Sequence, residues 1–339
     1  MLAPAAGHAG ADSTRYETET FTTTYTVDGT GYHISGVRPM AAGSYPVYVR
    51  IGSIDESYVS LWANAAIEAA AERGFVAASV EYANARFGDC SVIKARANAI
   101  FDSSSAVSAI SKLCASDKAD CSKGVVTGGL SQGSIISVLS NDSNKRVRAS
   151  SGQGTGSAYT GFYNLSEGVA DSKHTQSGDR LRVINGEHDV FVGGSQAIAA
   201  SQAPLVTGKT CSEGSHSCFR DDGSGWYIAK DNEVQDGYAD HCFMGYGGLP
   251  LTQCAGIHVD QNYSSSQKGW ELTPTIDWVT KFHRSTIDVL ARGRSLLSRA
   301  VSYLTAPSTP RARRARDRCT ASCDRLSWCA RVSAGTGRS

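Results

Sequence analysis

Short apolar runs alternate with segments of helical periodicity along most of this chain, and this alternation restricts the fold more than any other feature. The run at residues 75–82 is apolar without polar alternation, as expected for a strand covered on both faces. Strand–helix alternation is typical of a mostly parallel central sheet with helices on both faces, so we predict an α/β fold. The predicted strands are residues 46–51, 75–82, 124–127, 147–151, 181–185 and 226–229, and the predicted helices are residues 58–73, 91–114, 132–139 and 275–283.

An antiparallel start precedes this alternation. Residues 17–27 are Thr-rich with alternating aromatic residues, and residues 32–37 form a second extended run. Asp28-Gly29 stands between the two runs, and this dipeptide is typical of a two-residue hairpin turn. We therefore predict a β-hairpin at the edge of the sheet.

The composition is that of an ordinary globular protein. The chain has 339 residues, of which 41% are hydrophobic and 19% are charged, enough to bury one large core. Gly, Ser and charged residues interrupt every apolar stretch, so none approaches the roughly 18 uninterrupted apolar residues that a membrane-spanning helix needs. We expect a monomer with one main domain and no transmembrane segment.

The two ends of the chain differ from this main domain. Residues 286–339 hold 11 Arg and 3 Asp, whereas the whole chain has a net charge of only +1, so the body is mildly acidic. An acidic body gives no electrostatic footprint for nucleic acid. We predict a basic amphipathic helix followed by a disordered tail in residues 286–339. The tail is interpreted either as a membrane-surface or partner-binding segment or as a merely solvated one.

Residues 1–15 are predicted to be a flexible start. Ala9-Gly10-Ala11 before Asp12 has the small-x-small form of a signal-peptide cleavage site. No basic start or long apolar stretch precedes it, as a complete secretory signal would require. Two interpretations stay open, the remnant of a signal peptide and an Ala/Gly-rich segment without a targeting role.

Ten cysteines are many for a cytosolic enzyme, and six of them form pairs that are close in the sequence. Disulfides that close small loops imply an oxidising compartment, so we expect a secreted protein. Zinc binding is the alternative, but the two-residue cysteine spacing and paired histidines of a zinc site are missing. Cys90 is either free or bound to a cysteine of the tail. The predicted disulfides are Cys114 with Cys121, Cys211 with Cys218, and Cys242 with Cys254.

The motif Gly129-Leu130-Ser131-Gln132-Gly133 carries the clearest chemistry. The pattern is short, but an apolar run precedes it and a helical segment follows, which is the setting of a nucleophile elbow. A sharp turn there exposes the serine Oγ, and flanking glycines avoid clashes between strand and helix. The Gln132 N–H at the helix start would stabilise developing negative charge. We predict Ser131 as the nucleophile and Gln132 as an oxyanion-hole donor; a plain Gly/Ser turn is the alternative.

With this motif the chain resembles the α/β-hydrolase superfamily over roughly residues 16–284. In that superfamily the acid follows a strand after the nucleophile, and the histidine follows the last strand. The resemblance therefore implies a catalytic domain at residues 16–285 without a large cap, because residues 153–180 are too few and too polar for one. The supporting segments are the Ser131 motif, Gly186-Glu187-His188-Asp189 and Asp240-His241-Cys242.

Asp189 is the predicted acid of a Ser-His-Asp triad. It follows the predicted strand 181–185 after a Gly turn, where a carboxylate can reach the imidazole of a histidine from a neighbouring loop. Its role would be to orient the imidazole and stabilise the imidazolium, not to accept the proton. Glu187, two residues earlier, is the alternative acid, and a surface aspartate in a turn is the structural alternative.

His241 is the predicted base. It follows the predicted last strand within about a dozen residues, and the expected disulfide of Cys242 would hold its loop still. Rigidity matters because a displacement of about 1 Å can cost 10²-fold in rate. His258 is the alternative base. A merely structural His241 also stays open.

The second oxyanion donor is expected from the loop after the strand 46–51. The superfamily often has His-Gly at this point, whereas this chain has Ile51-Gly52. We favour the backbone N–H of Ser53 as the donor, and a simple strand-ending turn is the alternative.

A triad with two oxyanion donors performs acyl transfer through an acyl-enzyme that water then cleaves. The resemblance favours carboxylic esters, small or polymeric, as in secreted esterases and polyester or feruloyl-ester depolymerases. Peptidase or acyltransferase activity on the same triad is the first alternative. A non-catalytic hydrolase-like protein with a basic surface-binding tail is the second. No residue pattern indicates a cofactor or a catalytic metal.

Overall fold

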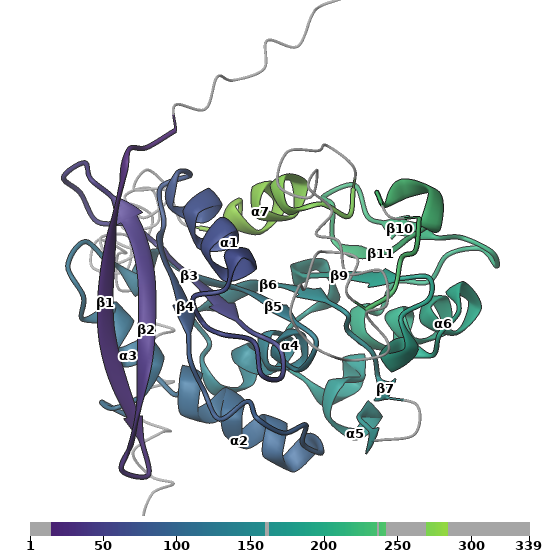
Figure 1. Cartoon of the computed structure of the whole chain (residues 1–339), viewed down its shortest axis with the longest axis horizontal. Helices are drawn as coiled ribbons and strands as arrows, with labels where there is room; N and C mark the ends of the chain where they lie inside the picture. The colour runs from purple at the N-terminus through teal and green to yellow at the C-terminus, as the bar shows by residue number, and fades with distance from the viewer. Residues whose placement is uncertain (1–14, 160–162, 236, 242–268, 284–339) are drawn as a thin grey trace, which may run out of the picture. The chain divides into compact units, whose positions relative to one another are not determined.

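The structure is a computed structural model that describes residues 15–159, 163–235, 237–241 and 269–283 (Figure 1). Contacts divide the chain into residues 1–285 and residues 286–339, and every described residue lies in the first unit. No helix of the described ranges is long and apolar enough to cross a membrane.

Nine strands of the described ranges form one mixed sheet with the order β1-β2-β4-β3-β5-β6-β9-β11-β10 (Figure 1). The six strands from β4 to β11 in this order pair in parallel, whereas β1, β2 and β10 are antiparallel to their neighbours. The strands are β1 (Thr18–Val27), β2 (Thr30–Pro39), β3 (Val47–Ile51), β4 (Val76–Val80), β5 (Val125–Leu130), β6 (Val147–Gln153), β9 (Leu181–Gly186), β10 (Ser217–Phe219) and β11 (Gly225–Ala229).

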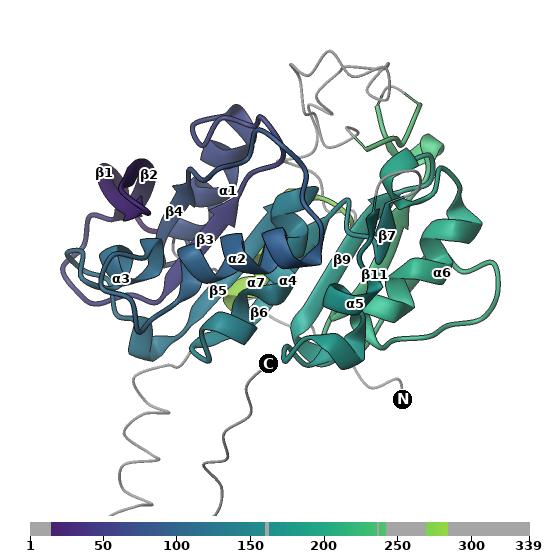
Figure 2. The ribbon, with the colours of Figure 1, turned by 90° about the horizontal axis from the view of Figure 1, so that it is seen from below.

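Helices cover both faces of the sheet, as predicted (Figures 1 and 2). Helices α1 and α7 pack on one face, and α2, α3, α4 and α6 pack on the other. The helices are α1 (Leu61–Ala71), α2 (Cys90–Phe101), α3 (Ala109–Cys114), α4 (Gln132–Ser143), α5 (Ser166–Val169), α6 (Gln196–Thr207) and α7 (Leu272–Thr280).

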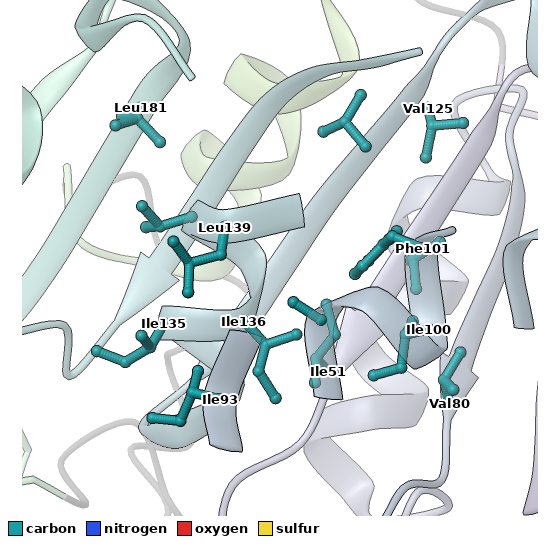
Figure 3. Packing of buried hydrophobic residues seen from close by; sticks show 14 of the residues in the cluster. Ile51, Val80, Ile93, Ile100, Phe101, Val125, Ile135, Ile136, Leu139 and Leu181 are labelled. Atoms are coloured by element: carbon teal, nitrogen blue, oxygen red, sulfur yellow. The ribbon is translucent and has the colours of Figure 1, made fainter. Parts of the chain in front are cut away.

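The parallel strands are apolar on both sides because each side faces a helix layer. In β3, Val47, Val49 and Ile51 pack under α2 and α4, whereas Tyr48 packs toward α1. Figure 3 shows the larger core between the sheet and helices α2 and α4. Its labelled residues are Ile51, Val80, Ile93, Ile100, Phe101, Val125, Ile135, Ile136, Leu139 and Leu181.

The predicted hairpin is confirmed, with β1 and β2 paired antiparallel from Thr18 opposite Pro39 to Val27 opposite Thr30. Its turn residues Asp28 and Gly29 both have positive φ, 48° and 81°. An aspartate tolerates this left-handed region better than most residues, and glycine adopts it freely, so the dipeptide matches the turn.

The predicted single helix over residues 91–114 is wrong, because the chain leaves the helical conformation between α2 and α3. Asp102 turns back on its own segment, with its Oδ1 accepting the Ser104 N–H at 2.8 Å. Ser108 then caps α3 by accepting the Ser111 N–H at 3.2 Å. Short polar side chains that bond the nearby backbone compete with helix continuation, and this outweighed the apolar spacing.

Helix α6 and strand β10 were absent from the prediction. Pro204 lies inside α6, and a proline in a segment of weak apolar periodicity argues against a helix from sequence alone. The segment folds as a helix because Ala199, Ala203 and Val206 pack against the sheet. β10 is only three residues long and pairs at the edge with β11.

The predicted disulfides Cys114–Cys121 and Cys211–Cys218 are confirmed. The third pair, Cys242 with Cys254, lies outside the described residues. Cys90 forms no disulfide with another described residue; its Sγ lies 3.4 Å from the Leu165 carbonyl oxygen. Between β6 and β9, the described residues form only the short β7 (Ala158–Tyr159), β8 (Tyr163–Asn164), α5 and two 3₁₀ turns, so they build no large cap.

Candidate active site

Ser131 stands at the strained turn between β5 and α4, with φ of 55° and ψ of −122°. Such a conformation is rare for a residue with a side chain. Glycines permit it. A Cβ at Gly129 would overlap the carbonyl oxygen of Gly133, and a Cβ at Gly133 would overlap the carbonyl oxygens of Ile51 and Gly52. The motif therefore needs glycine on both sides of the serine, because strand, helix and the loop after β3 meet there.

Asp189 and His241 lie together at the carboxyl ends of β9 and β11. Asp189 Oδ2 is 2.7 Å from His241 Nδ1, and because an ionised carboxylate only accepts, this bond calls for the Nδ1–H tautomer. Asp189 Oδ1 accepts the Phe191 N–H at 3.0 Å. Both residues are buried, 1% and 6% exposed, so little water competes for the bond. Gly154 leaves room for the imidazole, because a Cβ there would lie 2.6 Å from His241 Cε1.

The structure describes only one of the two alternative residues, Glu187 as the acid and His258 as the base. Glu187 does not contact His241; its carboxylate accepts the Asp231 N–H at 2.6 Å and pairs with the Lys230 ammonium. His258 lies outside the described residues.

The Ser131 hydroxyl is not hydrogen-bonded to the His241 imidazole within the described part of the chain. The Tyr159 phenol lies beside this site and donates to the Gly154 carbonyl at 3.1 Å. Burial, and then the charge of Asp189, raise the pKa of Tyr159, so the phenol is neutral and can donate. Catalytic hydrogen bonds are often loose before substrate binds.

The two predicted oxyanion donors are placed differently. Gln132 opens α4, and its N–H has no acceptor among the described residues, so it is free to bind an oxyanion. The Ser53 N–H is already used, because it donates to the buried Glu56 carboxylate at 2.6 Å. Ser53 can serve as the second donor only if Glu56 releases it. A carboxylate three residues later was the signal that the sequence reasoning passed over.

A buried chain of polar contacts fixes the Gln132 side chain. Arg96 on α2 donates to Gln132 Oε1 at 2.6 Å, and Gln132 Nε2 donates to the Tyr82 hydroxyl at 3.2 Å. Tyr82 in turn donates to the Gly52 carbonyl at 2.8 Å. Burial lowers the pKa of Arg96 and raises that of Tyr82. The elbow is thereby bound to the loop after β3, through residues far apart in the sequence.

Three aromatic rings line the region beside His241. Phe191 packs on the His241 imidazole with centroids 4.6 Å apart, Tyr159 lies 5.9 Å from Phe191, and Phe87 lies 4.6 Å from Tyr159. They come from three separate segments of the chain, so sequence spacing could not have grouped them. An apolar wall at this position suits an acyl or alcohol group with little charge.

A strained serine turn after the fifth strand of this sheet, with the acid and the imidazole beyond later strands, is the arrangement of the superfamily named above. The chain has the α/β-hydrolase fold. The antiparallel second strand and the order β1-β2-β4-β3-β5-β6-β9-β11 identify this fold without help from sequence similarity.

No protein-family model matches the chain, and no curated protein matches it. Solved structures similar to this chain include a cold-adapted esterase from an Arctic intertidal metagenomic library, at 13% identity, covering 81% of this chain and 98% of that one, with a TM-score of 0.49. Est1E from Butyrivibrio proteoclasticus matches at 10% identity, 77% and 96% coverage and a TM-score of 0.45. Brefeldin A esterase matches at 15% identity, 53% and 63% coverage and a TM-score of 0.35.

One cluster of the described residues has ligand types that can hold a metal ion, namely Glu187, His188 and Asp231. Each of these side chains already has a partner inside the protein. The Lys230 ammonium pairs with Glu187, and His188 Nε2 lies 3.0 Å from Asp231 Oδ2. The positive charge beside these carboxylates is therefore that of Lys230.

Proposed function

We propose that this protein is a serine hydrolase that cleaves carboxylic esters through an acyl-enzyme. Ser131 is the nucleophile, His241 the general base and Asp189 the residue that orients the imidazole. The observation that carries this proposal is the strained Ser131 turn at the same sheet edge as the buried 2.7 Å contact between Asp189 and His241.

The proposed reaction begins when Ser131 Oγ attacks the ester carbonyl. His241 Nε2 takes the Oγ proton, and the carbonyl oxygen becomes an oxyanion that accepts the free Gln132 N–H. The imidazolium then protonates the departing alcohol oxygen as the tetrahedral species collapses to the acyl-serine. A water molecule, deprotonated by His241, cleaves this ester by the same steps and releases the acid.

The ester substrate and the location outside the cell belong to the same proposal. The aromatic wall of Phe87, Tyr159 and Phe191 supports an uncharged ester over a charged one. The two disulfides fit an oxidising compartment and hence secretion. Small and polymeric esters both agree with these features.

Labelling by a fluorophosphonate probe tests the nucleophile directly, because the probe bonds covalently to an activated serine. We expect labelling of the full chain, no labelling of Ser131→Ala, and unchanged labelling of the exposed-serine control Ser201→Ala. We also expect His241→Ala to lower ester turnover by at least 10³-fold while His258→Ala does not. If Ser131→Ala is labelled as strongly as the unaltered chain, the proposal fails.

Ester and amide substrates separate the proposed activity from its alternatives. The full chain should hydrolyse a p-nitrophenyl acyl ester, and a peptide amide should be a much poorer substrate. A peptide rate equal to the ester rate would favour a peptidase. A dominant transfer product in the presence of an alcohol acceptor would favour an acyltransferase.

A further inference from the structure

The loops that carry the proposed acid and base are joined by one carboxylate, Asp231, which follows β11. Its Oδ1 accepts the Ala239 N–H at 2.9 Å, two residues before His241. Its Oδ2 lies 3.0 Å from His188 Nε2, one residue before Asp189. A single side chain therefore holds the backbone on the base side and a side chain on the acid side.

The same two loops also touch through their backbones. The His188 N–H donates to the Ala239 carbonyl at 2.9 Å. At the end of β9, a Cβ on Gly186 would overlap the carbonyl oxygens of Ala239 and Asp240, so glycine is needed for the loop before His241 to cross there. The imidazole of His188 stacks on the Tyr238 ring with centroids 4.7 Å apart.

Asp231 is itself held in place by Glu187. The Asp231 N–H donates to Glu187 Oε1 at 2.6 Å, and the other oxygen of Glu187 pairs with the Lys230 ammonium. Lys230 also donates to Gln196 Oε1 at 2.6 Å. Asp231 is therefore held in place by contacts other than those to Ala239 and His188. Its carboxylate can thus fix the position of the loop before His241.

We propose that Asp231 is a positioning residue that sets the geometry of the Asp189–His241 pair by holding the loop before His241 against the loop that bears Asp189. This inference rests on the proposed function, and Asp231 touches neither the Ser131 hydroxyl nor the imidazole of His241. The pair spans the ends of two strands, and a shift of about 1 Å in a catalytic group can cost 10²-fold in rate.

The test compares Asp231→Ala with a matched control, Asp222→Ala. Asp222 accepts a backbone N–H in the same way, from Ser224 at 2.8 Å, but it precedes β11 at the opposite end of that strand. We expect Asp231→Ala to lower kcat for a p-nitrophenyl ester about 10²-fold with KM within twofold. Asp222→Ala should leave both constants within twofold. A wild-type kcat in folded Asp231→Ala overturns the proposal.

Two further variants keep the test decisive if Asp231→Ala fails to fold. Asp231→Asn retains an oxygen for the Ala239 N–H and should recover kcat to within tenfold of the unaltered chain. His188→Phe keeps a ring on Tyr238 but loses the bond to Asp231, and should lower kcat about threefold to tenfold. An unchanged kcat in His188→Phe overturns the proposal.

A spectroscopic readout separates positioning from general stability. The Nδ1 proton of His241, bonded to Asp189, should give a low-field proton NMR signal in the full chain and in Asp222→Ala. The signal should shift or broaden in His188→Phe and Asp231→Ala; an unchanged signal contradicts the proposal. Failure of the proposed function is distinguishable, because Ser131→Ala would then still be labelled by the fluorophosphonate whatever Asp231 does.

Discussion

Ser131 combines a side chain with a positive φ of 55°, at a turn where the flanking glycines let the strand and the helix pack closely. The helix after it starts so close to the strand before it that Gly129 and Gly133 nearly touch. Backbone strain of this kind costs on the order of 1–3 kcal/mol and persists only when the surroundings determine it. The serine hydroxyl is thereby presented at the sheet edge, a placement that an unstrained turn would not give.

Gly129→Ala is expected to destabilise the protein by about 3 kcal/mol or more, because the new methyl group would overlap the Gly133 backbone and cannot move aside. Fluorophosphonate labelling should also be lost. Gly31→Ala is the control, since a Cβ there meets nothing within 4 Å, and its effect should stay within about 0.5 kcal/mol. Urea unfolding measures the stability of both variants. Equal urea concentrations at the unfolding midpoint for Gly129→Ala and Gly31→Ala would contradict this expectation.

At the scale of elements, a buried seam of hydroxyl groups joins β5, α4 and β6. Thr127 Oγ1 lies 2.7 Å from Ser137 Oγ and donates to Ser150 Oγ at 2.9 Å. All three residues are fully buried, 0–1% exposed. Buried hydroxyls are tolerated when they are bonded to one another, so this seam fixes how α4 sits on the strands that present Ser131.

Replacing Thr127 by valine keeps the shape and removes the central hydroxyl. Because Ser137 and Ser150 then lose a buried partner, we expect a loss of about 1–3 kcal/mol in the free energy of unfolding. Thr24→Val on the exposed side of β1 is the matched control and should change stability by less than about 0.5 kcal/mol. A Thr127→Val variant as stable as the control would show that the seam contributes nothing.

At the scale of the whole molecule, hydrogen bonds stabilise the ionised form of several surface carboxylates. Hydrogen bonds from Lys118 and then Arg38 lower the pKa of Glu19, and the Lys118 bond ties the hairpin to the loop after α3. Bonds from Ser91 and then the Val92 N–H lower the pKa of Asp89, the cap of α2. Bonds from Ser104 lower the pKa of Asp102, where that helix ends.

Because the pKa values of these carboxyls are lower in the folded than in the unfolded chain, their contribution is complete above the unfolded values and is lost as the pH falls through the folded ones. We expect the urea concentration at the midpoint of unfolding to fall progressively below about pH 4. Glu19→Gln should show a smaller fall between pH 7 and pH 3 than the unaltered chain. A midpoint independent of pH in this range would contradict the expectation.

The sequence by itself determined the elements whose cause is local. The Asp28-Gly29 turn, the buried strands of the parallel sheet and the serine turn between β5 and α4 all follow from properties of neighbouring residues, namely backbone preference, glycine spacing and apolar patterning. Together with the resemblance to the α/β-hydrolase superfamily, the order of Ser131, Asp189 and His241 along the chain led us to expect the last two at one sheet edge. The same local reasoning missed the break between α2 and α3, because polar side chains there bond their own backbone.

Only the tertiary structure decided which group each polar atom meets. Gln132 donates to Tyr82, and Asp231 bridges the loops before Asp189 and His241. Both contacts join segments that are distant in sequence but adjacent because parallel strands bring their carboxyl ends to one edge. The partner of a buried polar group depends on that three-dimensional proximity, and no pattern of residue types along the chain specifies it.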